Sequence, residues 1–217
     1  MENHNSLNAK DRILEAATRL FIEKGYKETT SRMIAKEANV NLGLLPYYFE
    51  KKENIAINVY SKHMKSLNQK IDYKMFNIEN SIEHFLFTYA MLQYHMNQEP
   101  GLMKLYLELI KEDIMLYSIE EYTVRSLELV EREYNLILGD NDLTMALNVI
   151  KGMERTLMLG KKEKKNELDD YAINVEIIKC GLLYLGVERG TLEKNVDSVE
   201  MKLHTAGIDF EVFKHHM

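Results

Sequence analysis

The side chains best suited to chemistry in this sequence are cationic, amide and aromatic groups in one short N-terminal stretch, namely Arg32, Asn41, Tyr47, Tyr48 and Lys52. Arginine and lysine neutralise phosphate groups, and an asparagine amide can pair with the edge of adenine. Apolar and aromatic side chains can add contacts to thymine methyl groups. Residues of these types can contact a nucleic acid, and they form no pattern for making or breaking covalent bonds.

Residues that could support catalysis are present but form no catalytic pattern. The sequence has no Gly-rich phosphate loop, no HExxH pair and no G-x-S-x-G turn. The seven histidines are scattered, and the adjacent His215 and His216 have no cysteine or carboxylate at the spacing of metal ligands. Cys180 lies in an apolar stretch, which favours a buried structural thiol over a reactive one. We therefore expect neither an enzyme nor a metal or other cofactor.

Two helical patterns joined by a short turn would position the N-terminal side chains. Asn8 gives the first helix a start signal and Gly25 a stop signal, while Thr30 is a good N-cap for the second helix. A third apolar cluster begins at Leu44, after a turn at residues 39–41. Two short helices joined in this way form a helix-turn-helix. The buried face of the first helix is expected to consist of Ile13, Ala16, Ala17, Leu20 and Phe21.

This segment resembles the N-terminal DNA-binding domain of the TetR family of bacterial transcriptional regulators. The resemblance runs in register over roughly 45 residues, which makes it more specific than a single helix-turn-helix signal. The alternative is that three helices share this spacing by chance. The matching residues are Ile13, Ala16, Ala17, Leu20, Phe21, Gly25, Tyr26, Thr29, Thr30, Ile34, Ala35, Ala38, Val40, Gly43, Leu45, Tyr48, Phe49, Lys52 and Glu53.

The resemblance implies a set of DNA-contacting residues around the second helix of the helix-turn-helix, which enters the major groove. The expected DNA-binding residues include Thr30. Phosphate contacts are expected from Arg32, Tyr48 and Lys52, and contacts to base edges from Asn41, Leu42, Leu44 and Tyr47.

Pro46 departs from the family pattern, in which this position is commonly aromatic. A proline inside a helix costs ~3 kcal/mol or more, because it lacks an N–H group and strikes the carbonyl four residues earlier. The conflict disappears if the recognition helix begins at Gly43, since Pro46 then lies in the first turn, where its N–H would have no partner. We therefore expect a late helix start.

The net charge of −6 is unevenly distributed along the chain. Residues 1–52 carry nine basic and seven acidic side chains, a net charge of +2, and the remainder carries 19 basic and 27 acidic side chains, a net charge of −8. This asymmetry favours phosphate contact at the N-terminal end, and a weakly basic domain would need two copies for firm binding. The sequence shows no membrane span, no signal peptide and a single cysteine, so a cytoplasmic location is expected.

The periodicity beyond Lys52 is helical almost throughout, which predicts an all-α protein. We expect a helix-turn-helix domain over 7–67, including the start of a linking helix, and a ligand-binding and dimerisation domain over 68–217. Capping signals at Asn80 and Ser118 and a first-turn proline at Pro100 mark helix starts, and a short helix is expected between Thr191 and Gly207. The charged run at 161–166 is expected to be a solvated loop, with a second DNA contact as the alternative.

The resemblance also implies dimerisation through the last two main helices, near 141–160 and 169–186. The first has a face with small residues in its middle, which permits close helix approach, and the second is apolar nearly all round. Such a helix is either central to its own domain or in contact with a partner chain. The expected interface residues are Met145, Val149, Gly152, Thr156, Ile173, Ile177 and Leu182.

The many methionines and tyrosines suit an adaptable small-molecule cavity, although each one alone could be an ordinary core residue. The expected pocket residues are Tyr89, Tyr94, Met103, Tyr106, Tyr122 and Met153. The resulting hypothesis is a homodimeric regulator, a repressor that binds a palindromic operator in double-stranded DNA and is released by a small-molecule effector. The alternative is a TetR-like helical interaction protein that acts through protein partners without specific DNA binding.

Overall fold

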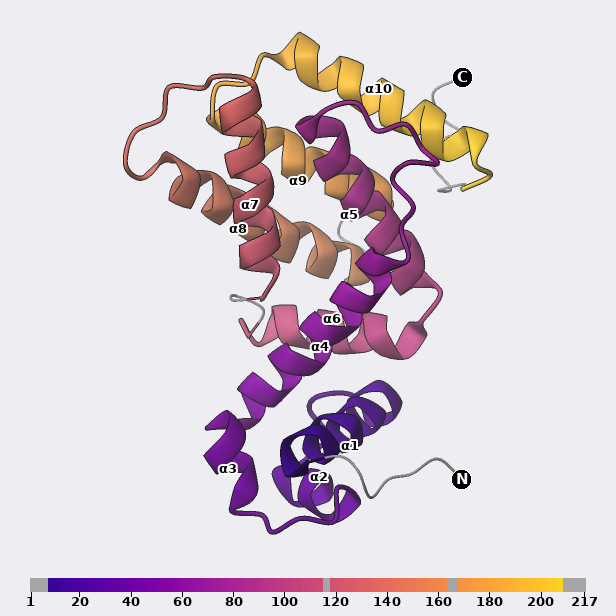
Figure 1. Cartoon of the computed structure of the whole chain (residues 1–217), viewed down its shortest axis with the longest axis vertical. Helices are drawn as coiled ribbons and strands as arrows, with labels where there is room; N and C mark the ends of the chain where they lie inside the picture. The colour runs from indigo at the N-terminus through magenta and orange to yellow at the C-terminus, as the bar shows by residue number, and fades with distance from the viewer. Residues whose placement is uncertain (1–7, 115–117, 164–167, 209–217) are drawn as a thin grey trace. The chain divides into compact units, whose positions relative to one another are not determined.

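The computed structural model describes residues 8–114, 118–163 and 168–208, and its secondary structure in these ranges is entirely helical (Figure 1), which confirms the all-α prediction. None of the described helices has both the length and the apolarity needed to traverse a lipid bilayer. The helices are α1 (Ala9–Lys24), α2 (Ser31–Glu37), α3 (Leu44–Phe49), α4 (Lys52–Gln69), α5 (Ser81–Asn97), α6 (Pro100–Lys111), α7 (Ser118–Glu133), α8 (Asp142–Lys162), α9 (Asp170–Tyr184) and α10 (Arg189–Thr205).

Local signals in the sequence set several helix ends. The side-chain oxygen of Asn8 accepts a hydrogen bond from the backbone N–H of Asp11 at 3.0 Å, and Thr30 caps α2 in the same way through Met33 at 3.2 Å. Asn80 caps α5, as expected. The C-terminal helix α10 is longer than the short helix expected there, since it begins at Arg189. The capping pair expected at the start of α7 lies outside the described side chains.

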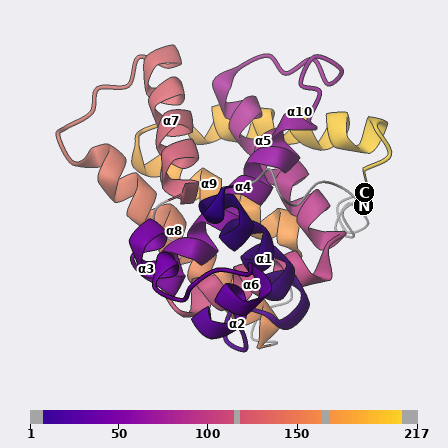
Figure 2. The same cartoon turned by 60° about the horizontal axis from the view of Figure 1, so that its bottom comes forward.

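The chain forms two compact units. Unit 1 contains the described residues up to Ser66 together with Glu99–Ser118, and unit 2 contains Leu67–Gln98 and the described residues from Ile119 onward. The boundary expected between residues 67 and 68 lies close to the end of the first segment. Helix α6, however, packs with the N-terminal helices, beside α1 (Figure 2), so the second expected domain is not one continuous packing unit.

Close packing of α6 against α1 depends on Gly101. A Cβ atom at this position would lie 2.4 Å from the backbone oxygen of Ile22, so only glycine allows the two helices to approach this closely. Tyr106 of α6 also stacks on Tyr60 of α4, with ring centroids 5.8 Å apart. Burial of these side chains explains why a segment distant in sequence belongs to unit 1.

Helix α9 is the centre of unit 2. It packs against α8 and α5, and α10 also contacts it (Figure 1). Ile173, Ile177 and Leu182 are at most 1% exposed, so they form the core of their own chain and the dimer contact expected from them is wrong. The close helix approach occurs at Gly181, where a Cβ atom would lie 2.6 Å from Ile150 of α8. The helix is apolar nearly all round because other helices of the same chain cover most of it.

Candidate nucleic-acid interface

Helix α3 buries one face and exposes the other. Leu45 and Phe49 are 3% and 4% exposed and anchor the helix in unit 1. Tyr47 is 75% exposed and Tyr48 36%, and their rings meet edge to face with centroids 4.9 Å apart. Large aromatic side chains are costly to leave in water, so an exposed pair on a firmly anchored short helix indicates a binding surface.

The turn before α3 is tightly hydrogen bonded. The side-chain oxygen of Asn41 accepts from the N–H of Gly43 at 2.9 Å, and its backbone oxygen accepts from the N–H of Leu44 at 2.9 Å. Leu42, which lies on this turn, is 42% exposed, while Leu44 is partly buried. The expected base-edge residues therefore collect around the exposed start of α3, with the amide oxygen of Asn41 engaged in the turn.

The position of Pro46 confirms the late helix start. Gly43 is the N-cap and Leu44 the first residue of α3, so Pro46 is the third residue, within the first turn. Backbone N–H groups in the first turn have no intrahelical partner, and a proline there removes no helical hydrogen bond. The recognition helix is short but not broken by its proline.

Helix α2 contributes polar groups from the same unit. Arg32 in its first turn is exposed, as expected of a phosphate contact. The hydroxyl oxygen of Thr30 accepts the capping hydrogen bond of α2, so this side chain fixes the helix start. Another exposed arginine of unit 1, Arg19 of α1, is paired with Glu37 of α2 at 3.2 Å.

The structure corrects the role expected for Lys52. Its ammonium group is half-buried and donates to the backbone oxygens of Tyr26 at 3.0 Å and Thr29 at 2.9 Å. It also lies over the Tyr26 ring, 3.9 Å from the centroid. Desolvation by burial lowers the pKa of Lys52. The ammonium group therefore holds the loop between α1 and α2 in place rather than reaching outward to phosphate.

Side chains of α6 also hold this loop. The carboxylate of Glu108 accepts from the backbone N–H groups of Tyr26 at 2.5 Å and Lys27 at 3.1 Å, and Lys104 donates to the backbone oxygen of Lys24 at 2.7 Å. Inside the loop, the Thr29 hydroxyl lies 2.7 Å from the backbone oxygen of Gly25. Sequence reasoning did not assign a role to Glu108, because its partner lies about eighty residues away and no local signal joins the two.

A further cation missed from the sequence lies beside α3. The ammonium group of Lys10 is 5.8 Å from the centroid of the Phe49 ring. Lys10 and Tyr48 line a groove of about 270 Å³ together with residues of α4. Lys10 precedes the apolar pattern of α1, so only the fold brings this cation to the groove beside Tyr48, which Glu50 also lines.

The expected pocket residues are divided between the two units. Tyr89 and Tyr122 of unit 2 come together, with ring centroids 6.2 Å apart, and the Tyr89 hydroxyl is 2.7 Å from that of Thr123. Met103 and Tyr106 instead belong to unit 1 through α6. The remaining two, Tyr94 and Met153, are partly buried in unit 2.

The expected dimer residues of α8 lie on an accessible face. Met145 is 46% exposed, and Gly152 and Thr156 are also exposed, with Val149 partly buried between them. A Cβ atom at Gly152 would meet no atom within 4 Å. Within the described part of the chain, no close packing requires a glycine at this position. Among the described residues, no group of three or more histidine, cysteine or carboxylate side chains is arranged to hold a metal ion.

Helices α1 to α3, with an anchored third helix and exposed residues on its outer side, define a helix-turn-helix domain. The model of the family "Bacterial regulatory proteins, tetR family" matches residues 13–59. The uncharacterized HTH-type transcriptional regulator YhgD of Bacillus subtilis (strain 168) is 40% identical over 70 residues, 32% of this chain and 37% of YhgD. The probable HTH-type transcriptional regulator YttP of the same organism is 29% identical over 136 residues, 58% of this chain and 66% of YttP.

The chain thus spans about a third to two thirds of the length of these curated relatives. The fold of the crystal structure of RolR in complex with the ligand resorcinol is similar, with a TM-score of 0.63, 14% sequence identity, and coverage of 86% of this chain and 92% of RolR. The chain belongs to the TetR family of bacterial transcriptional regulators. Members of this family are regulators and not enzymes.

Proposed function

We propose that this protein is a sequence-specific DNA-binding transcriptional repressor that binds a palindromic operator as a homodimer and is released by a small molecule. The observation that carries the proposal is the exposed aromatic pair Tyr47 and Tyr48 on α3, whose opposite face is anchored by Leu45 and Phe49. A rigid helix with a solvent-facing aromatic edge is suited to the major groove.

Within this proposal the residues have distinct roles. Tyr47, Leu42 and Leu44 face base edges and thymine methyl groups, together with the side-chain N–H₂ of Asn41. Arg32 and Tyr48 contact phosphates, which positions the helix without reading sequence. Thr30 and Lys52 act indirectly, because they hold the start of α2 and the loop before it. Lys10 adds a cation beside Tyr48.

Dimerisation supplies a second helix-turn-helix domain, so that two copies of α3 can contact the operator. The exposed face of α8, with Met145 and the unobstructed Gly152, is a self-complementary surface for a second copy of the chain. Two-fold symmetry requires a palindromic site, with half-site centres about one helical turn apart, ~10 bp, or a small extension of that. Because the protein acts on bacterial DNA, we place it in the cytoplasm.

Ligand control would run along continuous helices. Helix α4 begins in unit 1 at Lys52 and continues to Gln69 in unit 2. A ligand binds more tightly, by a few kcal/mol, to the state of the dimer that does not bind DNA. Its binding changes the spacing of the two helix-turn-helix domains and releases the operator. The ligand complex of the similarly folded RolR supports a small-molecule effector of this kind.

Selection of DNA fragments by the purified protein tests the proposal. We expect a random double-stranded library to yield a palindrome after repeated retention by the wild-type protein. Retention without enrichment of any sequence would contradict sequence-specific binding and favour an interaction protein that acts through protein partners.

A further inference from the structure

The groove of about 270 Å³ beside the recognition helix joins residues from three helices of unit 1. Lys10 belongs to the first turn of α1, Tyr48 to α3 and Asn54 to the first turn of α4. The sequence suggested a role in DNA binding for Tyr48 alone among these three. The groove shows which other side chains of the fold lie beside it.

Lys10, Asn54 and Tyr48 carry donor groups that are not used within the described part of the chain. The ammonium group of Lys10 is exposed and forms no ion pair there, and its nearest recorded contact is the Phe49 ring, 5.8 Å away at the centroid. The side-chain amide of Asn54 makes no hydrogen bond and is not fully buried. Tyr48 is 36% exposed, and its hydroxyl is likewise unpaired among the described residues. An acceptor group that enters the groove therefore breaks no existing side-chain hydrogen bond.

Asn58 and Glu50 are the remaining polar residues of the lining. The Asn58 amide is used within α4, where it donates to the backbone oxygen of Asn54 at 2.7 Å. The Glu50 side chain is exposed and has no cationic partner among the described residues. Its carboxylate opposes an anion in the groove, although solvent screens exposed charges. Removal of this charge should therefore strengthen the binding of an anionic group.

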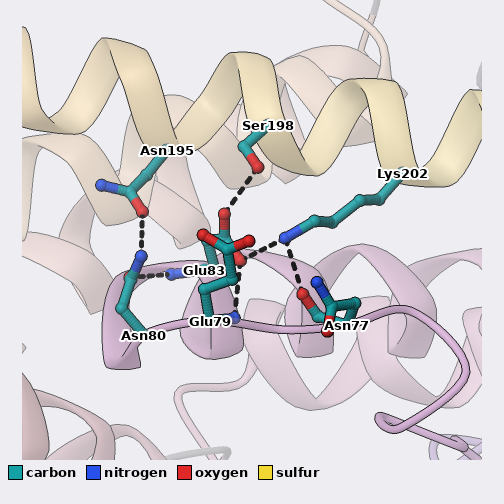
Figure 3. Close-up of polar contacts among 7 residues, drawn as sticks. All are labelled: Asn77, Glu79, Asn80, Glu83, Asn195, Ser198 and Lys202. Carbon is teal, nitrogen blue, oxygen red and sulfur yellow. Dashed lines mark hydrogen bonds and ion pairs between the residues drawn. The ribbon is translucent and has the colours of Figure 1, made fainter.

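The polar side chains between α5 and α10 of unit 2 provide a contrast, because they are already paired with one another (Figure 3). Lys202 donates to the backbone oxygen of Asn77 at 2.9 Å and to the buried carboxylate of Glu83. Asn80 donates to Asn195 at 2.7 Å. A satisfied network of this kind stabilises its own fold. The unused donors beside α3 have no such structural role.

The place of the groove in a DNA complex follows from the recognition helix. When a helix enters the major groove, the sugar-phosphate backbones that border the groove pass along its sides. Lysine, asparagine and tyrosine side chains are common donors to backbone phosphates. A groove that presents these three residue types next to α3 is therefore suited to a phosphate of the operator.

We propose that this groove binds one backbone phosphate of the operator, held by the Lys10 ammonium and the Asn54 amide beside the Tyr48 hydroxyl. The proposal rests on the proposed function, because α3 must first enter the major groove. It makes Lys10 and Asn54 positioning residues, which fix the recognition helix on DNA without reading the sequence.

The test uses the full-length protein and a selected operator in which single phosphates are replaced, one at a time, by uncharged methylphosphonate. At one position the replacement should weaken wild-type binding about fivefold to tenfold. The same replacement should have little effect on Lys10→Gln or Asn54→Ala, because these variants have already lost that contact. Lys10→Gln should also weaken binding to random DNA and reduce the slope of log affinity against log salt by about one.

Three further variants separate this contact from damage to the fold. Lys62→Gln removes the same charge from an exposed position of α4 outside the groove and should leave every methylphosphonate effect unchanged. Asn54→Asp should weaken DNA binding more than Asn54→Ala without a lower melting temperature, because an acidic residue is favourable in the first turn of a helix. Glu50→Gln should increase affinity for operator and random DNA, which a damaged fold would not do.

The outcomes distinguish the groove from the regulator. Operator binding in which every methylphosphonate effect persists in Lys10→Gln and Asn54→Ala would overturn the phosphate site and leave sequence-specific binding intact. Unchanged affinity in Asn54→Asp or no gain in Glu50→Gln would also overturn it. A wild-type protein that enriches no operator would overturn the proposed function and this phosphate site together.

Discussion

Removal of the Glu108 carboxylate on α6 should destabilise the loop between α1 and α2, although the two segments are about eighty residues apart in the sequence. This side chain accepts two backbone hydrogen bonds from the loop between α1 and α2, at 2.5 Å and 3.1 Å. Hydrogen bonds to a charged group contribute ~1.5–3 kcal/mol each, and one of these two is exposed. We expect Glu108→Ala to lower the free energy of unfolding of unit 1 by about 2–3 kcal/mol.

The loop also carries the backbone oxygens that receive Lys52. Glu108 and Lys52 therefore hold the same segment, and their effects should be coupled. In a double-mutant cycle with Lys52→Met, denaturant unfolding should give an interaction energy above ~0.5 kcal/mol. Affinity for the operator should fall in each single variant, because the loop leads directly to the capping residue Thr30 of α2.

Glu112 provides a matched control one turn further along α6. It forms an ion pair with Lys27 of the same loop at 2.7 Å, and both side chains are exposed to solvent. Solvent screens such a pair, so Glu112→Ala should leave stability and DNA affinity nearly unchanged. Strict additivity of Glu108→Ala and Lys52→Met, or equal effects of Glu108→Ala and Glu112→Ala, would refute this account of the loop.

Three further changes test other parts of the structure. Gly152→Arg places a charge on the accessible face of α8 and should convert the dimer into a monomer in sedimentation at micromolar concentration; an unchanged dimer would reject this interface. Pro46→Ala should lower stability by at most ~1 kcal/mol, and a large rise in the melting temperature would show strain at this first-turn proline. Burial raises the pKa of Glu83, but hydrogen bonds from Lys202 and Ser198 outweigh it and lower the pKa overall. Stability from this carboxylate is therefore complete above the unfolded pKa of about 4.3 and lost as pH falls below it, and Lys202→Met should weaken that acid dependence in denaturant unfolding.

Features that depend on neighbouring residues could be predicted from the sequence. The caps at Asn8, Thr30 and Asn80 act within three residues of themselves, and they start helices where expected. The position of Pro46 in the first turn of α3 followed from the chemistry of proline alone. The exposed Tyr47 agrees with its predicted place on the outer side of the recognition helix.

Features set by contacts between distant segments could not be predicted. An apolar helix such as α9 has the same sequence pattern in a core as at a subunit interface, and only the packing against α5 and α8 distinguishes them. Lys52 matches a phosphate-binding position in sequence, but its partners are backbone oxygens of Tyr26 and Thr29. The grouping of α6 with α1 depends on Gly101, whose missing side chain carries no local signal.

The most direct test of the account compares wild-type protein and Tyr47→Ala on a selected operator and on random DNA of the same length. Tyr47 is 75% exposed, so its loss should not change the melting temperature. We predict that the variant loses at least about tenfold in affinity for the operator while its affinity for random DNA stays the same, since a base contact contributes ~1–3 kcal/mol and a phosphate contact gives no sequence preference. Equal loss on both DNA molecules, or no loss on either, would contradict the claim that α3 reads the operator.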